Sequence, residues 1–237
     1  MRAGTITLIL AEAALETIPK EISGHPAVKN QARRLGVKWS ELLLDKSYHY
    51  AAMKKLRNSA KRGRPDIVHF ALMEALSTPL FIENKLRVYV HTSSDKIIAV
   101  ADSLRVPKSY FRFEGLMVKL FKEGSVKSEE GAVLMELTDG TFQSLLEVIS
   151  PEKIIGLSTT GVRGSAQKAG KILADSENCA VVIGCFPKGH FTERTTRYLG
   201  PTYSISDLGL EAHVVIARVL YECEKLLEKG INHEGDK

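Results

Sequence analysis

The chain has 237 residues and a mass of 26.2 kDa, and 44% of its residues are hydrophobic and 26% charged. This composition excludes disordered, collagen-like and disulfide-stapled proteins, and the length is ample for a buried core. No stretch approaches the roughly 20 apolar residues that a membrane-spanning helix needs. Lysine and arginine total 33 against 28 acidic residues, which gives a net charge of +5 and permits a polyanionic partner without requiring one.

The three cysteines are an odd number without paired metal spacing, so we expect free thiols at Cys179, Cys185 and Cys223. The seven histidines are scattered, and no metal site is expected. The apolar run at 6–10 is too short for a signal peptide and is interpreted as a first strand. These features are typical of a cytoplasmic protein.

Strands and helices alternate along the chain, which predicts an α/β fold. The first strand, TITLILA, is followed by an alanine- and glutamate-rich stretch that we expect to turn helical. Pro65 and Asp66 form a good helix start. The expected strands are ELLLD at 41–45, 86–92, 97–101, KIIGLST and 179–184, and the expected helices begin at Pro65 or cover 111–124, 141–149, 166–173 and about 208–229.

Two of these helices carry more detailed expectations. In the helix at 111–124 we expect Phe111 and Phe113 in the core and Gly124 as the stop. The last helix has two apolar stripes, too wide a surface for one-sided packing, and the second stripe is assigned to a subunit contact. The first stripe is Leu210, Val214, Ala217 and Tyr221, and the second is Ile216, Leu220, Cys223 and Leu227.

Common catalytic signatures are missing from the sequence. There is no G-x-G-x-x-G, G-x-x-x-x-G-K-[ST], H-E-x-x-H or G-x-S-x-G, so the usual dinucleotide, triphosphate, zinc-protease and serine-hydrolase motifs are excluded. Three small-residue loops, GLST, GCFPKGHF and TYSISDL, each follow an apolar segment. Such loops let backbone groups approach a ligand closely, although on composition alone they are equally consistent with turns.

Positive charge is concentrated in two tracts that contain no acid. Residues 46–65 hold seven lysines and arginines and end in RGRPD, and residues 103–113 interleave Arg105, Lys108 and Arg112 with aromatic residues. Arginines that bind phosphates, beside aromatic faces that stack on unpaired bases, are the usual means of holding single-stranded RNA. The alternative is a solvated helix face and a strand with core aromatics. Asp66 lies two residues from Arg64 and is suited to orienting that guanidinium.

The order and spacing of several segments identify a family. The sequence resembles the ribosome-biogenesis N(1)-specific pseudouridine methyltransferases of the SPOUT class, and their archaeal branch in particular. The resemblance covers nearly the whole chain and rests on HPAVKNQARRLG, ELLLDKSYHYAAMKKL, RGRPDIVHFALMEAL, LRVYVHT, LRVPKSYFRFEGLMVKLF, VVIGCFPKGHF and SIS.

The resemblance implies a single α/β SPOUT domain, a Rossmann-like sheet with a deep C-terminal trefoil knot, and a homodimer. It implies an RNA-binding part at about 1–150 and a knotted, cofactor-binding part at about 151–229. The implied S-adenosylmethionine site comprises Leu157, Ser158, Gly184, Phe186, Gly189, Tyr203, Ser204, Ile205 and Leu208. The implied RNA contacts are Arg62, Arg64, Arg105, Lys108 and Arg112, with Arg64, Asp66 and Arg105 taking part in catalysis.

Two positions depart from the family pattern. Lys108 stands where members usually have arginine, so its contact is expected to be with a phosphate. Ser77 stands where an acid often occurs, and no general base is assigned there.

The implied activity is methylation of N(1) of a pseudouridine in small-subunit ribosomal RNA. A second hypothesis is an assembly factor that binds ribosomal RNA and ribosomal proteins, with methylation secondary. A third, a small-molecule methyltransferase, is disfavoured by the two basic tracts.

Overall fold

The computed structural model describes residues 5–232, which form a mixed eight-stranded sheet in the order β4-β5-β3-β2-β1-β7-β6-β8. β1 lies in the middle and is parallel to both β2 and β7, while β3, β5 and β4 continue one side antiparallel. β6 is parallel to β7 and to β8. The strands are β1 (Thr5–Ala13), β2 (Leu86–Thr92), β3 (Lys96–Val100), β4 (Ser125–Lys127), β5 (Val133–Asp139), β6 (Lys153–Arg163), β7 (Asn178–Gly184) and β8 (Thr202–Ser204).

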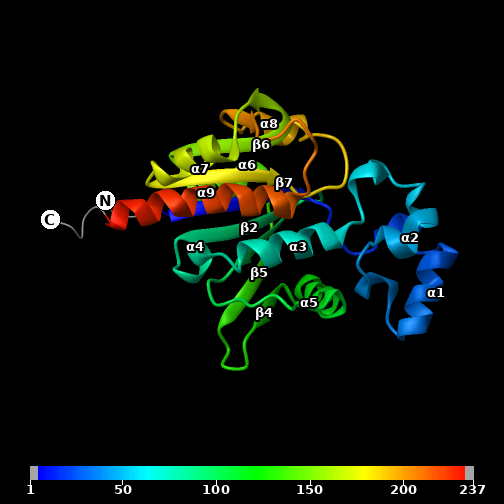
Figure 1. Ribbon diagram of the computed structural model, residues 1–237. Helices are drawn as coiled ribbons and strands as arrows, with labels where there is room; N and C mark the ends of the chain where they lie inside the picture. The colour runs from blue at the N-terminus through cyan, green and yellow to red at the C-terminus, as the bar shows by residue number, and fades with distance from the viewer. Residues whose placement is uncertain (1–4, 233–237) are drawn as a thin grey trace.

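Helices cover both faces of this sheet, as Figure 1 shows. One face carries α3, α4, α5, α7 and α9, and the other carries α6 and α8. The short α1 and α2 lie together at one side of the molecule. The helices are α1 (Pro26–Leu35), α2 (Lys46–Met53), α3 (Pro65–Ala75), α4 (Pro79–Ile82), α5 (Tyr110–Glu123), α6 (Phe142–Ile149), α7 (Ala166–Ala174), α8 (Glu193–Thr196) and α9 (Ala212–Asn232).

Local sequence signals explain where several helices begin and end. Pro65 is the first residue of α3 and Asp66 lies in its first turn, as predicted. The hydroxyl of Thr141 accepts a hydrogen bond from the Ser144 amide at the start of α6. Gly124 ends α5 with a φ of 75°, a conformation that glycine adopts without strain.

The core consists of two layers with β1 between them. Successive side chains of β1 point to opposite faces of the sheet, so Leu8 packs on the α3/α9 side and Ile9 on the α6/α8 side. Because helices cover both faces of the sheet, the side chains on both sides of β1 are buried, and its sequence is a nearly continuous apolar run. A separate small cluster around Val28 and Leu44 stabilises the α1 and α2 segment.

The expectation that a helix follows β1 is wrong. Glu12 has a φ of 51° beside a β-bulge, and the chain continues extended until Thr17 makes an isolated bridge with Leu43. The glutamates of this stretch form ion pairs with distant bases, Glu12 with Lys61 and Glu16 with Arg62. These tertiary contacts override the local helix propensity. The expected strand at 41–45 is likewise reduced to that bridge, after a 3₁₀ turn at Trp39–Glu41.

Two expectations about packing are also wrong. Phe113 is fully buried, but Phe111 is 74% exposed because it lies on the outer side of α5. The second stripe of the last helix is core, since Ile216 and Leu220 are buried among residues of the main cluster. The exposed member is Tyr221 of the first stripe, so that stripe remains available for a subunit contact.

The last helix also begins later than expected, at Ala212. Within residues 5–232, no helix is both long and apolar enough to cross a membrane.

Candidate functional site

A cavity of about 340 Å³ lies at the carboxyl end of β7, between a bulge within β6, the loops that follow β7 and β8, and the start of α9. Ligands of open α/β sheets bind at this edge. All nine residues of the implied cofactor site line this one cavity. They are Leu157, Ser158, Gly184, Phe186, Gly189, Tyr203, Ser204, Ile205 and Leu208.

The first wall of the cavity comes from an irregularity in β6. Tyr203 of β8 pairs with both Leu157 and Val162, so residues 158–161 bulge out of the ladder. A Cβ on Gly161 would lie 2.6 Å from the Tyr203 carbonyl carbon, which only glycine avoids. The expected small-residue loop is therefore a bulge within a longer strand, and it presents Ser158 to the cavity.

The second wall is the loop that follows β7, and the amino-terminal half of the chain holds it in place. Lys61 donates hydrogen bonds to Glu12 Oε2 at 2.7 Å and to the His190 carbonyl. Its ammonium also lies 4.0 Å from the centre of the Phe186 ring. Glu12 Oε1 accepts from the Thr192 amide at 2.6 Å and from the Thr192 hydroxyl at 2.8 Å. The segment 186–192 is thus fixed at both of its ends.

Arg64 lines the same cavity, and Asp66 orients it as the sequence predicts. Arg64 Nε donates to Asp66 Oδ1 at 2.8 Å, and Nη2 donates to Oδ2 at 2.7 Å. The hydrogen bonds that Arg64 donates to Asp66 raise the pKa of the guanidinium, which keeps it fully charged. Both side chains stay about one third exposed, at 37% and 30%, so the guanidinium has donors left for another partner.

The other implied RNA contacts lie outside the cavity lining. Arg105, Lys108 and Arg112 are exposed on the segment that leads into α5 and on its first turn. That segment is held against α3, because His69 Nε2 lies 2.7 Å from the Pro107 carbonyl oxygen. The exposed ring of Phe111 lies beside Arg112 in sequence and adds an aromatic face to this surface.

Arg62 is engaged within the protein. Its Nε and Nη2 donate to the two carboxylate oxygens of Glu16 at 2.8 and 2.6 Å. The basic tract is therefore partly neutralised by acids that are distant in sequence, whereas Lys46, Lys54, Lys55 and Arg57 stay exposed.

The sequence did not indicate every residue of the cavity. Ile67 of α3 and Val215 of α9 form part of the wall. Helical spacing indicates only an apolar helix face for Ile67, and Val215 belongs to neither apolar stripe of the last helix. Glu211 places an acid at the rim and interacts electrostatically with Arg64. Nothing in its local sequence distinguishes Glu211 from a surface residue.

The cysteines are unpaired and buried. Burial raises the pKa of Cys179 to about 11, so its thiol is protonated at neutral pH. Throughout residues 5–232, no group of three or more histidine, cysteine, aspartate or glutamate side chains is arranged to hold a metal ion.

Fold and cavity together define the class: an α/β protein with a ligand cavity at the carboxyl ends of its parallel strands and a basic surface beside it. Residues 8–224 match the family model described as "EMG1/NEP1 methyltransferase". The chain belongs to this EMG1/NEP1 methyltransferase family.

Individual relatives match over nearly their full length. The "Ribosomal RNA small subunit methyltransferase Nep1" of Thermococcus onnurineus is 39% identical over 217 residues, 92% of this chain and 97% of the relative. The protein of the same name from Staphylothermus marinus is 41% identical over 221 residues, 93% of this chain and 96% of the relative. The crystal structure of Archaeoglobus fulgidus Nep1 bound to S-adenosylhomocysteine has a TM-score of 0.82 and 37% identity, and the match covers 94% of this chain and 98% of that one.

Proposed function

We propose that the protein transfers a methyl group from S-adenosylmethionine to small-subunit ribosomal RNA, at the N(1) ring nitrogen of a pseudouridine. The observation that carries the proposal is the single cavity that unites all nine implied cofactor residues with Arg64, which belongs to the basic tract. Relatives that match nearly the whole chain are named ribosomal RNA small subunit methyltransferases, and the similar solved structure holds S-adenosylhomocysteine.

The cavity suits the cofactor in size and chemistry. About 340 Å³ falls within the range of small-molecule sites, and the walls combine apolar side chains with a few hydroxyls, as such sites do. Leu157, Ile205 and the Tyr203 ring offer apolar surface to a nucleoside. The Ser158 hydroxyl is hydrogen-bonded to the Thr160 hydroxyl, and the Ser204 hydroxyl donates to the Ser206 carbonyl, so both add polar groups to the wall. S-adenosylmethionine supplies, when bound, an electrophilic methyl group on a sulfonium.

The roles of Arg64, Asp66 and Arg105 follow from charge. As N(1) of the base bonds to the methyl carbon, the bond between that carbon and the sulfonium sulfur would break and release S-adenosylhomocysteine, while the N(1) proton goes to water. Loss of that proton places negative charge on the neighbouring carbonyl oxygens. A fixed guanidinium stabilises that charge without a strong base. Asp66 sets the direction of Arg64, and Arg105 approaches from the α5 side. The target nucleotide leaves its stack to enter the cavity.

The two halves of the chain divide the work within one sheet. Residues up to about 150 supply the RNA surface, with Arg64, Arg105, Lys108 and Arg112 as contacts, and residues from about 151 to 229 hold the cofactor. Arg62 is left out of these contacts because Glu16 engages its guanidinium. The proposal includes a cytoplasmic location, a complex with ribosomal RNA, and ribosomal proteins as further partners.

The proposal also includes a trefoil knot in the carboxyl-terminal part and a homodimer. Residues 202–204 run close beside residues 158–164. This supports the knot, because the chain between these two segments must loop around before α9 packs on α7. Exposed apolar side chains on the outer side of α3 and α9, Phe70 and Tyr221 among them, support a subunit contact there.

Transfer of labelled methyl to a small-subunit ribosomal RNA hairpin, made once with uridine and once with pseudouridine, tests the activity. We expect transfer to the pseudouridine hairpin alone. If cofactor and RNA both bind and neither hairpin is methylated, the assembly-factor hypothesis replaces this one.

Arg64→Gln tests the role of the guanidinium in a single-turnover assay. The rate at saturating RNA should fall at least tenfold, about 1.4 kcal/mol in barrier height, with the dissociation constant for S-adenosylhomocysteine unchanged. Lys153→Gln, at the amino-terminal end of β6, is the matched control. An unchanged rate for Arg64→Gln contradicts the assigned role.

A further inference from the structure

A second and larger cavity, about 680 Å³, opens on the α6/α8 side of the sheet. We call it the back basin. Its walls come from the end of β1, the turn after β2, the start of α6, the α8 segment and residues 57–62 of the basic tract. Only the 186–192 segment separates it from the first cavity, since His190 and Phe191 line one and Thr192 lines the other.

The basin is positively charged once its ion pairs are counted. Each acid in its wall has a partner: Glu12 pairs with Lys61, Glu16 with Arg62 and Asp95 with Arg194. Arg57 and Arg197 also line the basin and are exposed. Among residues 5–232, neither of these two arginines takes part in an ion pair. Two guanidiniums are therefore left without a counter-charge.

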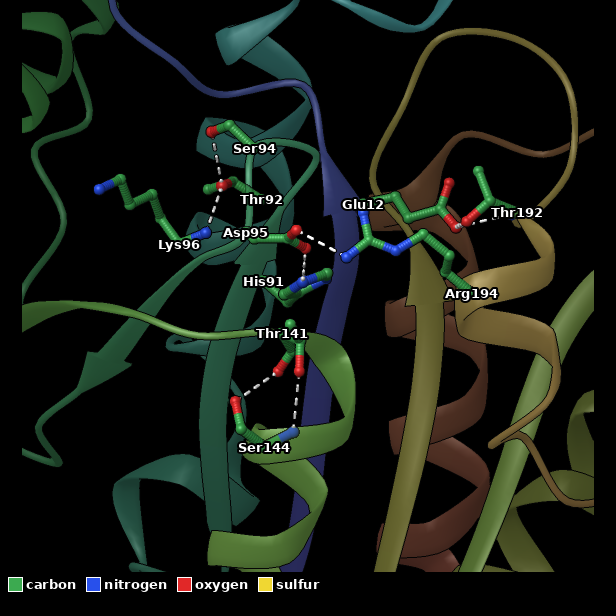
Figure 2. A network of polar contacts seen from close by, with 10 residues as sticks. All are labelled: Glu12, His91, Thr92, Ser94, Asp95, Lys96, Thr141, Ser144, Thr192 and Arg194. Carbon is green, nitrogen blue, oxygen red and sulfur yellow. Dashed lines mark hydrogen bonds and ion pairs between the residues drawn. The ribbon is translucent and has the colours of Figure 1, made fainter.

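A third guanidinium is held at a fixed position, as Figure 2 shows. Arg194 extends from the α8 segment to Asp95 in the turn after β2, where its Nη2 donates to Oδ2 at 2.7 Å. That bond uses one of the five N–H donors of the arginine. Asp95 thus orients Arg194 as Asp66 orients Arg64, and the remaining donors are available to an anion.

The floor of the basin contains a polar group that lacks a partner. His91 lies beneath Asp95, its side chain is 5% exposed, and its Nε2 lies 3.4 Å from Asp95 Oδ1. Nδ1 is buried and has no hydrogen-bond partner within the described part of the chain. Buried polar atoms are normally hydrogen-bonded, so an unpartnered one in a cavity wall indicates that the site is completed from outside.

We propose that the back basin binds the phosphodiester backbone of the RNA strand that flanks the target nucleotide, through Arg57, Arg194 and Arg197. This inference rests on the proposed function. Guanidiniums match phosphate oxygens in geometry and charge. A strand whose target nucleotide enters the first cavity has only the 186–192 segment to cross before it reaches the basin, and the basic tract forms the near edge of both sites.

The test is the salt dependence of RNA binding by the double variant Arg57→Gln/Arg197→Gln, which removes two charges that no internal ion pair uses. For single strands each lost phosphate contact reduces the slope of log K against log[KCl] by about 0.7, so we expect a slope shallower by about 1.4. The affinity for S-adenosylhomocysteine should not change. Arg87→Gln, an exposed position on β2 near its amino-terminal end, is the control and should leave the slope unchanged.

RNA length gives a second readout. Shortening the single-stranded flank on one side of the target should weaken binding to the wild-type protein and have little effect on the double variant. An unchanged slope in the double variant, or an equal change in Arg87→Gln, overturns the proposal. Adenosine monophosphate is a further probe. If it binds the wild type and not the double variant, while the salt dependence of RNA binding is the same in both, the basin is a mononucleotide site and the proposal is overturned.

The design separates this proposal from the proposed function. If Arg105→Gln weakens RNA binding and the basin variant does not, the basin proposal fails and the RNA enzyme stands. If the wild-type protein binds S-adenosylhomocysteine and no RNA, the proposed function itself fails.

Discussion

Replacement of Lys61 by methionine tests whether the amino-terminal half fixes the loop after β7. Methionine keeps most of the length and apolar character of lysine and removes the charge. The ammonium it removes bonds to Glu12 and to the His190 carbonyl and lies over the Phe186 ring. Glu12 keeps its two bonds from Thr192 and loses its counter-charge while its side chain is 7% exposed.

Breaking a buried ion pair by removing one partner costs about 3–5 kcal/mol. Because the Lys61 side chain is itself 20% exposed, we expect the lower end, about 3 kcal/mol in the free energy of unfolding at pH 7. Release of the loop should also weaken binding of S-adenosylhomocysteine by about tenfold, which is about 1.4 kcal/mol. Denaturant titration and calorimetry without RNA measure both. Lys85→Met, which breaks the exposed pair with Glu83, should cost less than about 1 kcal/mol.

The loss of folding stability caused by Lys61→Met should depend on pH. Burial favours a higher pKa for Glu12, and the hydrogen bonds from Lys61 and Thr192 together lower it below 4.5. A lowered pKa in the folded state stabilises the protein above the unfolded value and ceases to do so as pH falls through the folded value. Without Lys61, burial raises the pKa of Glu12, so the carboxylate becomes protonated at a higher pH than in the wild type. The destabilisation by Lys61→Met should therefore be smaller at pH 5 than at pH 7. This account is refuted if the free energy of unfolding of Lys61→Met lies within about 0.5 kcal/mol of the wild-type value at pH 7. It is also refuted if the loss of stability grows as the pH falls.

Two further changes test the packing. Phe113→Ala should lower the free energy of unfolding by about 3–5 kcal/mol, measured by thermal unfolding. Phe111→Ala should change it by less than about 0.5 kcal/mol and should weaken RNA binding, measured by RNA titration. Equal losses of stability in the two variants would contradict the exposure of Phe111. Gly170→Ala should destabilise the protein by about 1–3 kcal/mol, because the added Cβ would lie 2.8 Å from the Cys223 amide nitrogen where α7 meets α9. A more stable alanine variant, as helix propensity alone predicts, would show that the two helices separate easily.

Local patterns were sufficient for several regular elements of this fold, although they gave no expectation of α1, β4, β5 or β8. Alternating and helical periodicity predicted β2, β3, α3, α5 and α6 because each buries a face that its own sequence defines. The resemblance to a family supplied the cofactor residues, and the small-residue loops had already been noted at the ends of apolar segments. All of these residues line one cavity, and their contact with the cofactor stays a prediction.

The errors occur where distant residues decide the local structure. The stretch around the end of β1 has the composition of a helix, yet Glu12 and Glu16 are not helical because they bind partners about 46–49 positions away in the sequence. For the same reason the 46–65 tract is less basic in space than in sequence. Both stripes of the last helix are apolar in sequence. Only the packing of α9 against α3 and α7 shows that Ile216, of the second stripe, faces the core and that Tyr221, of the first, does not. The back basin has no sequence signature, since residues from five separate segments form it.

The place of β1 in the sheet has a consequence for how the chain is made. β1 is synthesised before both of its neighbours in the sheet, and it pairs on one side with β2 and on the other with β7, where Thr5 meets Asn178. During translation one edge of β1 stays unpaired until β7 emerges, and such edges are prone to join other chains. The walls of the first cavity are complete only once the start of α9 follows. The nascent protein therefore carries an open strand edge for most of its synthesis, and ligand capture marks the end of folding rather than an early step.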